Sequence, residues 1–410
     1  MDLDYAGLAR KARILRRSFH GARYSARDIV MNADAGEGGF PGTNKRRVLA
    51  LRVGSAVLLL VVFLLGGEVI ARLDDTLFFG VPFFSNPTDD DLTTRDWFGR
   101  RGRAYGQFGK WKLNSLGFRG PEITVERAPA CARIVVLGAS ETFGYLESPG
   151  HEYPSLLARK LAGRGCVEVV NAAVVGMIVG TMQGYWTNWV ARLHPDVVLI
   201  YPSPLLYLGN TAVHGVQPPP VPPSTLASSA APDAPVDHSF ESRFLSRVRG
   251  YAGALVPRWV NMYRLEHRVR ATLAALPPAP DINSPPAEDL AAFRRDLNGL
   301  IERIRSSGAR VILLTHAERA GWPIERRDIP DLWAMRAYLP HASLPELVEF
   351  DRVGNAIIRE TAQQQQVQVI DTAAELNGRF DSFGDLVHFN DKGADTVASL
   401  IAQQTRLPSR

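Results

Sequence analysis

The chain has 410 residues, of which 46% are hydrophobic and 22% charged, so it is long enough for one large folded domain with accessory segments. Its formal net charge of +5 is unevenly spread: residues 1–52 carry eleven Lys and Arg against five Asp and Glu, and the remaining 358 residues sum to −1. This distribution gives no basic face for nucleic acid, and the nine histidines show no clustering typical of metal ligands. The sequence therefore predicts neither a nucleic-acid partner nor a metal or other cofactor.

A long apolar segment follows the N-terminal basic tail, residues 1–47. Residues 48–71 are almost wholly apolar, and 24 helical residues span about 36 Å, enough for a hydrocarbon core of about 30 Å. A buried core helix would show a polar face, and a cleaved signal peptide fits poorly because 47 residues precede the apolar run. We expect a single helix in membrane lipid, with the basic tail in the cytoplasm and the rest of the chain on the other side of the membrane.

Strands alternate with helices after a connecting segment at 72–125. Short apolar runs predict five strands, and helical patterns lie between or after them. The strands are expected at 134–137, 167–170, 197–201, 310–314 and 367–370, and the helices at 153–161, 181–193, 291–306, 345–363 and 392–403. This alternation predicts an α/β fold with a doubly wound, flavodoxin-like parallel sheet in three α/β/α layers, spanning 126–410.

Two cysteines directly precede the first two predicted strands. Cys131 and Cys166 then lie at the same edge of the sheet if the strands are neighbours. A disulfide is expected there outside the cytoplasm, and closing a 35-residue loop stabilises a fold by roughly 4 kcal/mol. Two unrelated buried thiols are the alternative.

An insertion at about 205–286 interrupts the alternation. Prolines at 218–220 and 222–223 lead into Ser/Ala/Pro-rich sequence that cannot form regular structure, whereas 251–276 has a partly helical pattern. So long an insertion is either a lid over a site or a docking arm for a partner.

A nucleophile, a base and an orienting acid can be placed together at the carboxyl ends of the strands, where open parallel sheets bind ligands. Ser140 follows the first strand, and Asp385 and His388 are three residues apart near the C-terminus. At that spacing the carboxylate can hold one imidazole nitrogen, leaving the other to take a proton from a serine. Ser140, His388 and Asp385 are therefore the predicted catalytic residues.

Other side chains near these strands allow less specific interpretations. His316, after the fourth strand, either lines the cleft or is an ordinary loop histidine. Trp186 and Trp189 are interpreted as core packing rather than as a platform for a sugar. Glu141 and Glu147 are interpreted as helix-start or surface charges.

The sequence blocks around these residues resemble the SGNH/GDSL hydrolase family, particularly membrane-anchored members from bacterial polysaccharide loci and the related alginate-type O-acetyltransferases. Residues 134–144 resemble the first block, with Ser140 as nucleophile, and 385–393 resemble the last, which gives Asp385 and His388 their acid and base roles. The resemblance covers about residues 110–410 and implies an SGNH-like fold.

Two further blocks bear on the oxyanion site. Residues 169–176 resemble the second family block, which implies that the amides of Gly176 and Ser140 donate to the oxyanion. In the third block this chain lacks the family's Gly-x-Asn-Asp, whose asparagine is an oxyanion donor, and Ser203 and Asn210 are the candidate replacements. Losing one such donor typically costs on the order of 10²–10³ in rate. The upstream stretch 114–120 is also similar to a segment of the anchored relatives.

The resemblance implies a membrane-tethered serine esterase or O-acyltransferase, with acetyl as the expected acyl group and a cell-envelope or exported polysaccharide ester as substrate. Membrane-bound acyl-donor or polysaccharide-export proteins are the implied partners. The alternative is a catalytically weak or inactive SGNH-like protein that binds glycan or scaffolds an export complex. The missing asparagine and the Pro-rich insertion favour this alternative, and the intact triad opposes it.

Overall fold

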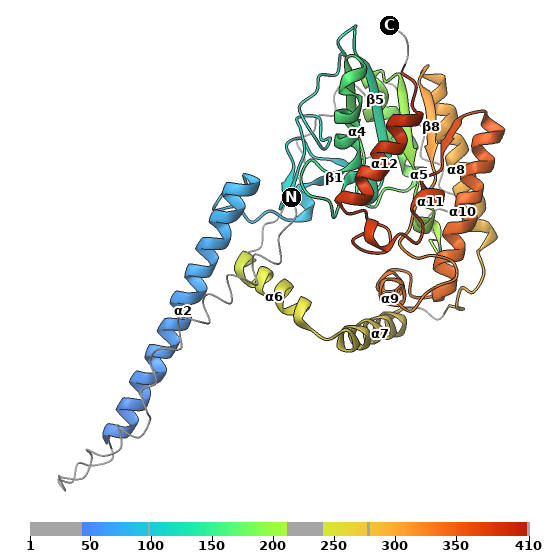
Figure 1. Ribbon diagram of the computed structural model, residues 1–410. Helices are drawn as coiled ribbons and strands as arrows, with labels where there is room; N and C mark the ends of the chain where they lie inside the picture. Colours follow the sequence, from blue (N-terminus) through green and yellow to red (C-terminus); the bar gives the residue numbers. More distant parts are fainter. Residues whose placement is uncertain (1–42, 97–98, 211–240, 277–278, 408–410) are drawn as a thin grey trace. The chain divides into compact units, whose positions relative to one another are not determined.

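The computed structural model of the protein describes residues 43–96, 99–210, 241–276 and 279–407 (Figure 1). The chain divides into two compact units, residues 1–66 and 67–410. Most of the predicted cytoplasmic tail and the whole Pro-rich stretch of the insertion lie outside the described residues.

The first described helix, α2 (Thr43–Phe79), contains the whole apolar segment predicted at 48–71 and extends beyond both its ends. By length and composition it can cross a membrane, and none of its most apolar stretch is buried. Such a helix is compatible with a single-pass membrane anchor, and a signal sequence has the same properties.

A five-stranded parallel sheet forms the centre of the second unit. Its strands are β5 (Ala132–Gly138), β6 (Val167–Asn171), β7 (Val197–Tyr201), β8 (Arg310–Leu314) and β9 (Gln368–Ile370). They are arranged in the order β6-β5-β7-β8-β9, and all four pairings are parallel. This is the flavodoxin-like order, so the predicted sheet is confirmed.

Helices cover both faces of the sheet, because the strands are continuous apolar runs that must be buried on both sides. In β5, Ile134 and Val136 face one core and Val135 and Leu137 face the other. The first core lies under α4 (Tyr153–Leu161) and α12 (Asp391–Gln404); the second lies under α5 (Val179–Tyr185), α8 (Ala287–Ser306) and α10 (Leu344–Gln365) (Figure 1).

The helix predicted at 181–193 is not continuous. After α5 the chain forms a π-helical turn, η3 (Trp186–Val190), and then a tighter turn, η4 (Ala191–Leu193). Trp186 is buried in the core as predicted. Trp189 is half-buried, and the guanidinium of Arg101 lies 4.4 Å from its ring centroid.

The edge of the sheet at the start of β5 carries a disulfide between Cys131 and Cys166, which confirms the predicted pairing. Ala132 is in register with Val167, and its amide donates to the carbonyl of Cys166 at 2.9 Å. The two cysteines therefore lie next to each other because the strands that they precede are neighbours.

The predicted connecting segment is folded and belongs to the same unit as the sheet. It contains two short hairpins, β1 (Thr93–Asp96) with β2 (Gly99–Gly102) and β3 (Gln107–Phe108) with β4 (Trp111–Lys112). The stretch 114–120 is a tight turn at which Gly117, with φ +80°, passes so close to Gly102 that a Cβ would lie 2.4 Å from the Gly102 carbonyl oxygen.

This turn directs Arg119 into the protein. The Arg119 guanidinium donates to the carbonyls of Phe143 (2.5 Å) and Gly144 (2.6 Å) and pairs with Glu152 at 3.2 Å, while its backbone amide donates to Asn171. Arg119 and Glu152 are both buried, so the pair compensates two charges that would be costly to bury alone.

The described part of the insertion is helical. It consists of α6 (Arg243–Leu255) and α7 (Arg258–Ala275), of which only the region 251–276 was predicted to have a helical pattern. Helix α7 packs against α9 (Ile329–Arg336). The remaining short helices are α3 (Ser140–Phe143) and α11 (Thr372–Leu376).

Candidate active site

Ser140 lies at the carboxyl end of β5, as the first residue of the short helix α3. The strand-to-helix turn depends on Gly138, where a Cβ would lie 2.1 Å from the hydroxyl oxygen of Thr142. The Thr142 hydroxyl is itself fixed by a 2.8 Å hydrogen bond with Tyr153. Gly144 ends the helix in a left-handed conformation, with φ +86°. This local geometry holds Ser140 half-buried at the end of the strand.

Asp385 and His388 form the predicted pair. Both carboxylate oxygens of Asp385 contact Nδ1 of His388, at 2.8 and 3.0 Å, and one of them also accepts the backbone amides of Val387 and His388. Gly384 closes this turn by donating its amide to the carbonyl of His388. The pair is therefore made in a tight turn and not on a helix, and Nε2 of His388 is buried with no hydrogen-bond partner among the described residues.

The turn shifts the pKa values of both members in the direction that a general base requires. Burial alone would lower the pKa of His388, but its hydrogen bond to Asp385 and the negative charges of Glu141, Asp385 and Glu147 outweigh burial and raise it above 6.5. Burial would raise the pKa of Asp385, and its bonds to His388 and to backbone amides lower it instead. Asp385 is thus ionised and holds the ring in one orientation.

The loop after Ser140 packs against the turn that carries His388. The amide of Tyr145 donates to the carbonyl of Ser140, and the Tyr145 ring lies 5.2 Å from the His388 ring. Leu146 covers Gly384, where a Cβ would lie 2.5 Å from the leucine. The Ser140 hydroxyl donates to Oε2 of Glu141 at 3.4 Å rather than to His388. Serine and imidazole are thus held in one neighbourhood without a hydrogen bond between them.

A buried chain of polar groups lies behind Ser140. The carboxylate of Glu141 accepts from the hydroxyl of Ser203 at 2.7 Å and from Nε2 of His316 at 3.2 Å. Nδ1 of His316 pairs with Asp351 at 2.6 Å. The side chain of Asn355 accepts a hydrogen bond from the backbone amide of His316 and donates one to the backbone carbonyl of His316. All five residues are nearly inaccessible to solvent.

Opposite charges stabilise this chain. Burial favours neutral His316, but Asp351 and Glu141 outweigh it and raise the histidine pKa to about 10. Burial likewise favours protonated Glu141, yet the bond to His316 and the charges of His316 and His388 lower the glutamate pKa to about 2. At neutral pH an imidazolium therefore lies between two carboxylates directly behind the nucleophile turn.

The three possible site-lining residues make internal contacts. His316 follows β8 and is fully buried, and its ring contacts the carboxylates of Glu141 and Asp351. The hydroxyl of Ser203 is donated to Glu141, and the side-chain amide of Asn210 donates to the carbonyl of Leu206. Neither contact is the oxyanion interaction for which these two residues were candidates.

The interpretation of the two glutamates as helix-start or surface charges is only partly correct. Glu141 does lie at a helix start, but it is 4% exposed, and Glu147 is 0% exposed, so neither is a surface charge. Burial raises the pKa of Glu147 to about 7, because its contacts with the amide of Leu146 and the charges of Arg119 and His388 only partly offset the loss of solvent.

Gly176 lies in the loop after β6 with φ +71° and is exposed. That loop is tied to the serine turn at two points: the amide of Val174 donates to the carbonyl of Gly138, and the side chain of Asn171 donates to the carbonyl of Thr142 at 3.0 Å. The guanidinium of Arg100 donates a hydrogen bond to the carbonyl of Val175 in the same loop. The predicted oxyanion pair, Ser140 and Gly176, thus comes from two adjoining turns.

A row of aromatic rings leads away from His388. Tyr145 stacks on Trp111 with centroids 4.9 Å apart, and Trp111 stacks on Phe108 at 5.7 Å. Trp111 and Phe108 come from the β3–β4 hairpin, which the sequence interpretation had treated as connecting segment. In the part of the chain with described coordinates, no group of three or more His, Cys, Asp or Glu is placed to hold a metal ion.

No family model and no curated protein sequence matches the chain. Similar solved structures include an acetyl xylan esterase, with 14% sequence identity and a TM-score of 0.37, which covers 67% of this chain and 100% of that one. A lipase/acylhydrolase from Enterococcus faecalis is similar at 17% identity and a TM-score of 0.38, and it covers 68% of this chain and 98% of that one. A GDSL-like lipase from Bacteroides thetaiotaomicron is also similar, with 12% identity and a TM-score of 0.34, and it covers 66% of this chain and 86% of that one. These TM-scores lie below 0.5, so the architecture rests on this chain's own strand order and the site on its own side chains.

Proposed function

We propose that the chain is a membrane-tethered serine esterase or O-acyltransferase of the SGNH/GDSL type. One observation carries the proposal: Asp385 fixes the His388 ring by its Nδ1 and leaves Nε2 buried and unpartnered among the described residues, in a turn packed against the loop of Ser140. A buried imidazole nitrogen without a partner is costly, and a serine hydroxyl is the partner that this position offers.

The mechanism begins with a rotation of the Ser140 hydroxyl from Glu141, where its contact is long, to Nε2 of His388. His388 takes the proton as Oγ attacks the ester carbonyl. The amides of Ser140 and Gly176 donate to the oxyanion, and His388 then protonates the departing alcohol. The acyl group passes from Ser140 to water in an esterase, or to a sugar hydroxyl in a transferase.

The oxyanion site has one donor fewer than the family pattern that the sequence resembles. The hydroxyl of Ser203 donates to Glu141, so the oxyanion is stabilised by two backbone amides only. Because one donor is worth about 10²–10³ in rate, we expect slow turnover on small esters. This same observation favours the second candidate function, a glycan-binding or scaffolding protein of an export complex.

The place of action and the substrate follow from the chain's other features. Helix α2 would anchor the protein, with the excess of Lys and Arg before it in the cytoplasm. The disulfide supports an oxidising compartment such as the periplasm. An acetylated envelope or exported polysaccharide is the proposed substrate, and the aromatic row from Tyr145 to Phe108 offers apolar surface beside His388. Acyl-donor or export proteins of the membrane are the proposed partners.

The test is hydrolysis of a small acetyl ester by the full-length protein in detergent, compared with Ser140→Ala. Ser306→Ala, which changes an exposed serine at the end of α8, is the matched control and should keep the wild-type rate. Equal rates for wild type and Ser140→Ala would leave the scaffolding function as the better account. An acetyl adduct on Ser140 whose loss is accelerated by added oligosaccharide identifies a transferase rather than an esterase.

A further inference from the structure

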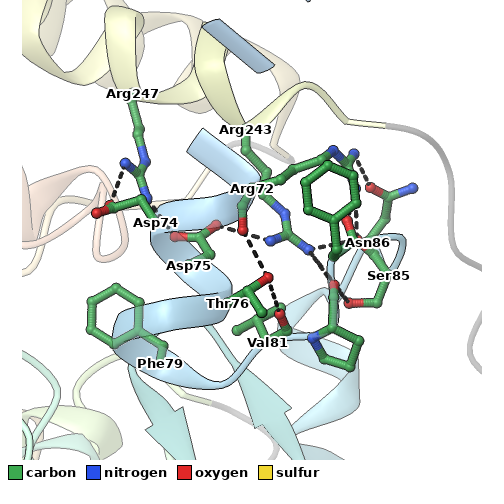
Figure 2. A network of polar contacts seen from close by, with 12 residues as sticks. Arg72, Asp74, Asp75, Thr76, Phe79, Val81, Ser85, Asn86, Arg243 and Arg247 are labelled. Atoms are coloured by element: carbon green, nitrogen blue, oxygen red, sulfur yellow. Dashed lines mark hydrogen bonds and ion pairs between the residues drawn. The ribbon is translucent and has the colours of Figure 1, made fainter. Parts of the chain in front are cut away.

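Helix α6 is fixed to the C-terminal end of α2 by paired charges (Figure 2). Arg243 pairs with Asp75 at 3.1 Å, and Arg247 contacts both Asp74, at 2.6 Å, and Asp75. Arg243 also donates to the carbonyl of Ser85, in the segment after α2. These contacts involve partly buried groups in a network, in which ion pairs contribute more than isolated surface pairs do.

A second set of contacts lies nearer the apolar part of α2. The carboxylate of Glu68 accepts from the hydroxyl of Ser242 at 2.8 Å and from the amide of Phe244 at 3.0 Å, which satisfies donors at the start of α6. The Phe244 ring lies over Gly67, where a Cβ would be only 2.7 Å from it. Gly67 therefore lets the ring pack against the backbone of α2.

Together the two sets of contacts fix which face of α6 points toward each end of α2. Gly67 precedes Asp74 by seven residues, about 10 Å along a helix, and the apolar run of α2 ends next to Gly67. The arginines of α6 thus face the end of α2 that is remote from the apolar run, and Phe244 faces the end adjoining it.

The face of α6 that contains Phe244 is apolar, and its later side chains are exposed in the part of the chain that the structure describes. Phe244, Val248, Tyr251 and Leu255 follow the i, i+4, i+7, i+11 spacing of one helix face. Val248 is 43% exposed, Tyr251 75% and Leu255 85%. Apolar side chains this exposed on one stripe mark a surface that is covered by something else.

Helix α7 extends this surface with aromatic and basic groups. Trp259 is 74% exposed and Tyr263 66%, and Arg264, Arg268 and Arg270 are exposed as well. Between them α6 and α7 contain seven arginines and a single acidic residue. Aromatic side chains with an excess of arginine are typical of helices that lie in the headgroup region of anionic bilayers.

We propose that α6 and α7 form a membrane-surface arm, which binds the phospholipid headgroup region of the bilayer that α2 crosses. Val248, Tyr251, Leu255 and Trp259 enter the interface, and the exposed arginines contact lipid phosphates. This inference rests on the proposed single-pass anchor, because only a membrane at the apolar run of α2 places lipid next to Gly67. It assigns the described part of the insertion to a lipid partner rather than to a lid.

The test uses full-length protein in nanodiscs of phosphatidylethanolamine and phosphatidylglycerol that carry nitroxide lipids. The chain's two cysteines are joined in a disulfide, so a single introduced cysteine can be labelled with a fluorophore. Leu255→Cys reports on the arm and Leu58→Cys on the anchor. Ser306→Cys, at an exposed position at the end of α8, is the matched control away from the arm.

We expect nitroxides near the headgroups to quench the label at residue 255 several-fold more than the label at 306, and nitroxides deep in the acyl chains to quench the label at 58. Quenching at 58 with equal quenching at 255 and 306 overturns the arm and leaves the anchor. A label at 255 that is shielded from water but not quenched identifies a protein partner, which also overturns the proposal. If the label at 58 is not quenched, the anchor itself fails, and the arm fails with it.

Discussion

Glu141 and Glu147 are both buried and lie six residues apart. Replacing each by glutamine should change the free energy of unfolding in opposite directions. The surroundings of Glu141 lower its pKa from 4.5 to about 2, and at roughly 1.4 kcal/mol per unit they favour its charged form by about 3 kcal/mol. Glu141→Gln removes that charge and leaves the His316 imidazolium with one carboxylate, so we expect a loss of about 3 kcal/mol in the free energy of unfolding near pH 6.5.

The cost of Glu141→Gln should depend on pH through His316. The pKa of this histidine is raised from 6.5 to about 10, so the stability contributed by its charge is fully present below pH 6.5 and is lost as the pH rises through 10. The difference between wild type and Glu141→Gln should therefore shrink between these two pH values.

Glu147→Gln is the matched control with the opposite sign. The pKa of Glu147 is raised from 4.5 to about 7 by burial, so ionising it above pH 4.5 costs the folded state up to about 3 kcal/mol by pH 8. A glutamine never ionises and can still accept from the amide of Leu146. We expect the variant to match wild type near pH 4 and to exceed it at pH 8.

Both variants can be measured by urea unfolding of the full-length protein in detergent, followed by near-ultraviolet circular dichroism, with the disulfide intact. The reasoning is refuted if both substitutions destabilise the protein equally at pH 8. It is also refuted if the cost of Glu141→Gln is the same at pH 6.5 and pH 10, since the charge of His316 would then not be the cause.

Three further outcomes follow from the site and the sheet. Because only neutral His388 can accept a proton and its pKa is raised, ester hydrolysis should increase with pH through a midpoint above 6.5, as measured by initial rates from pH 5 to 9. Replacing Cys131 and Cys166 together by serine should lower the free energy of unfolding by about 4 kcal/mol, measured by urea titration, because the disulfide closes a 35-residue loop. Gly138→Ala places a Cβ against the Thr142 hydroxyl, so thermal unfolding should show a destabilisation of about 1–3 kcal/mol, and ester hydrolysis should fall with it.

The sheet was predictable because each strand is a short apolar run bounded by polar or turn-forming residues. The bounds of β7, β8 and α4 agree with the sequence prediction residue for residue. The hairpin strands β3 and β4 were missed because two residues each carry no periodic signal. The helix expected at 181–193 was predicted as continuous because its apolar spacing does not reveal the π-helical turn at η3.

The site was only partly predictable for a similar reason. Asp385 and His388 are three residues apart, so their contact is local and can be inferred from spacing. Glu141, His316 and Asp351 meet only in the folded chain, where α3, the end of β8 and α10 come together. The sequence around Glu141 does not reveal that Ser203 and His316 lie behind it, and its position next to the nucleophile was the only signal.

The contacts of Arg119 fix how far the site can work from the end of α2. A flexible chain as long as residues 80–125 would have a root-mean-square end-to-end distance of about 35–40 Å, and the position of the domain would vary over a similar range. Here that segment is folded into hairpins, and its last buried side chain is bonded to the carbonyls of Phe143 and Gly144, directly after the helix that begins with Ser140. The segment is a folded spacer rather than a flexible linker. If the chain is the anchored enzyme proposed above, the distance from the end of α2 to Ser140 varies far less than a flexible linker would allow.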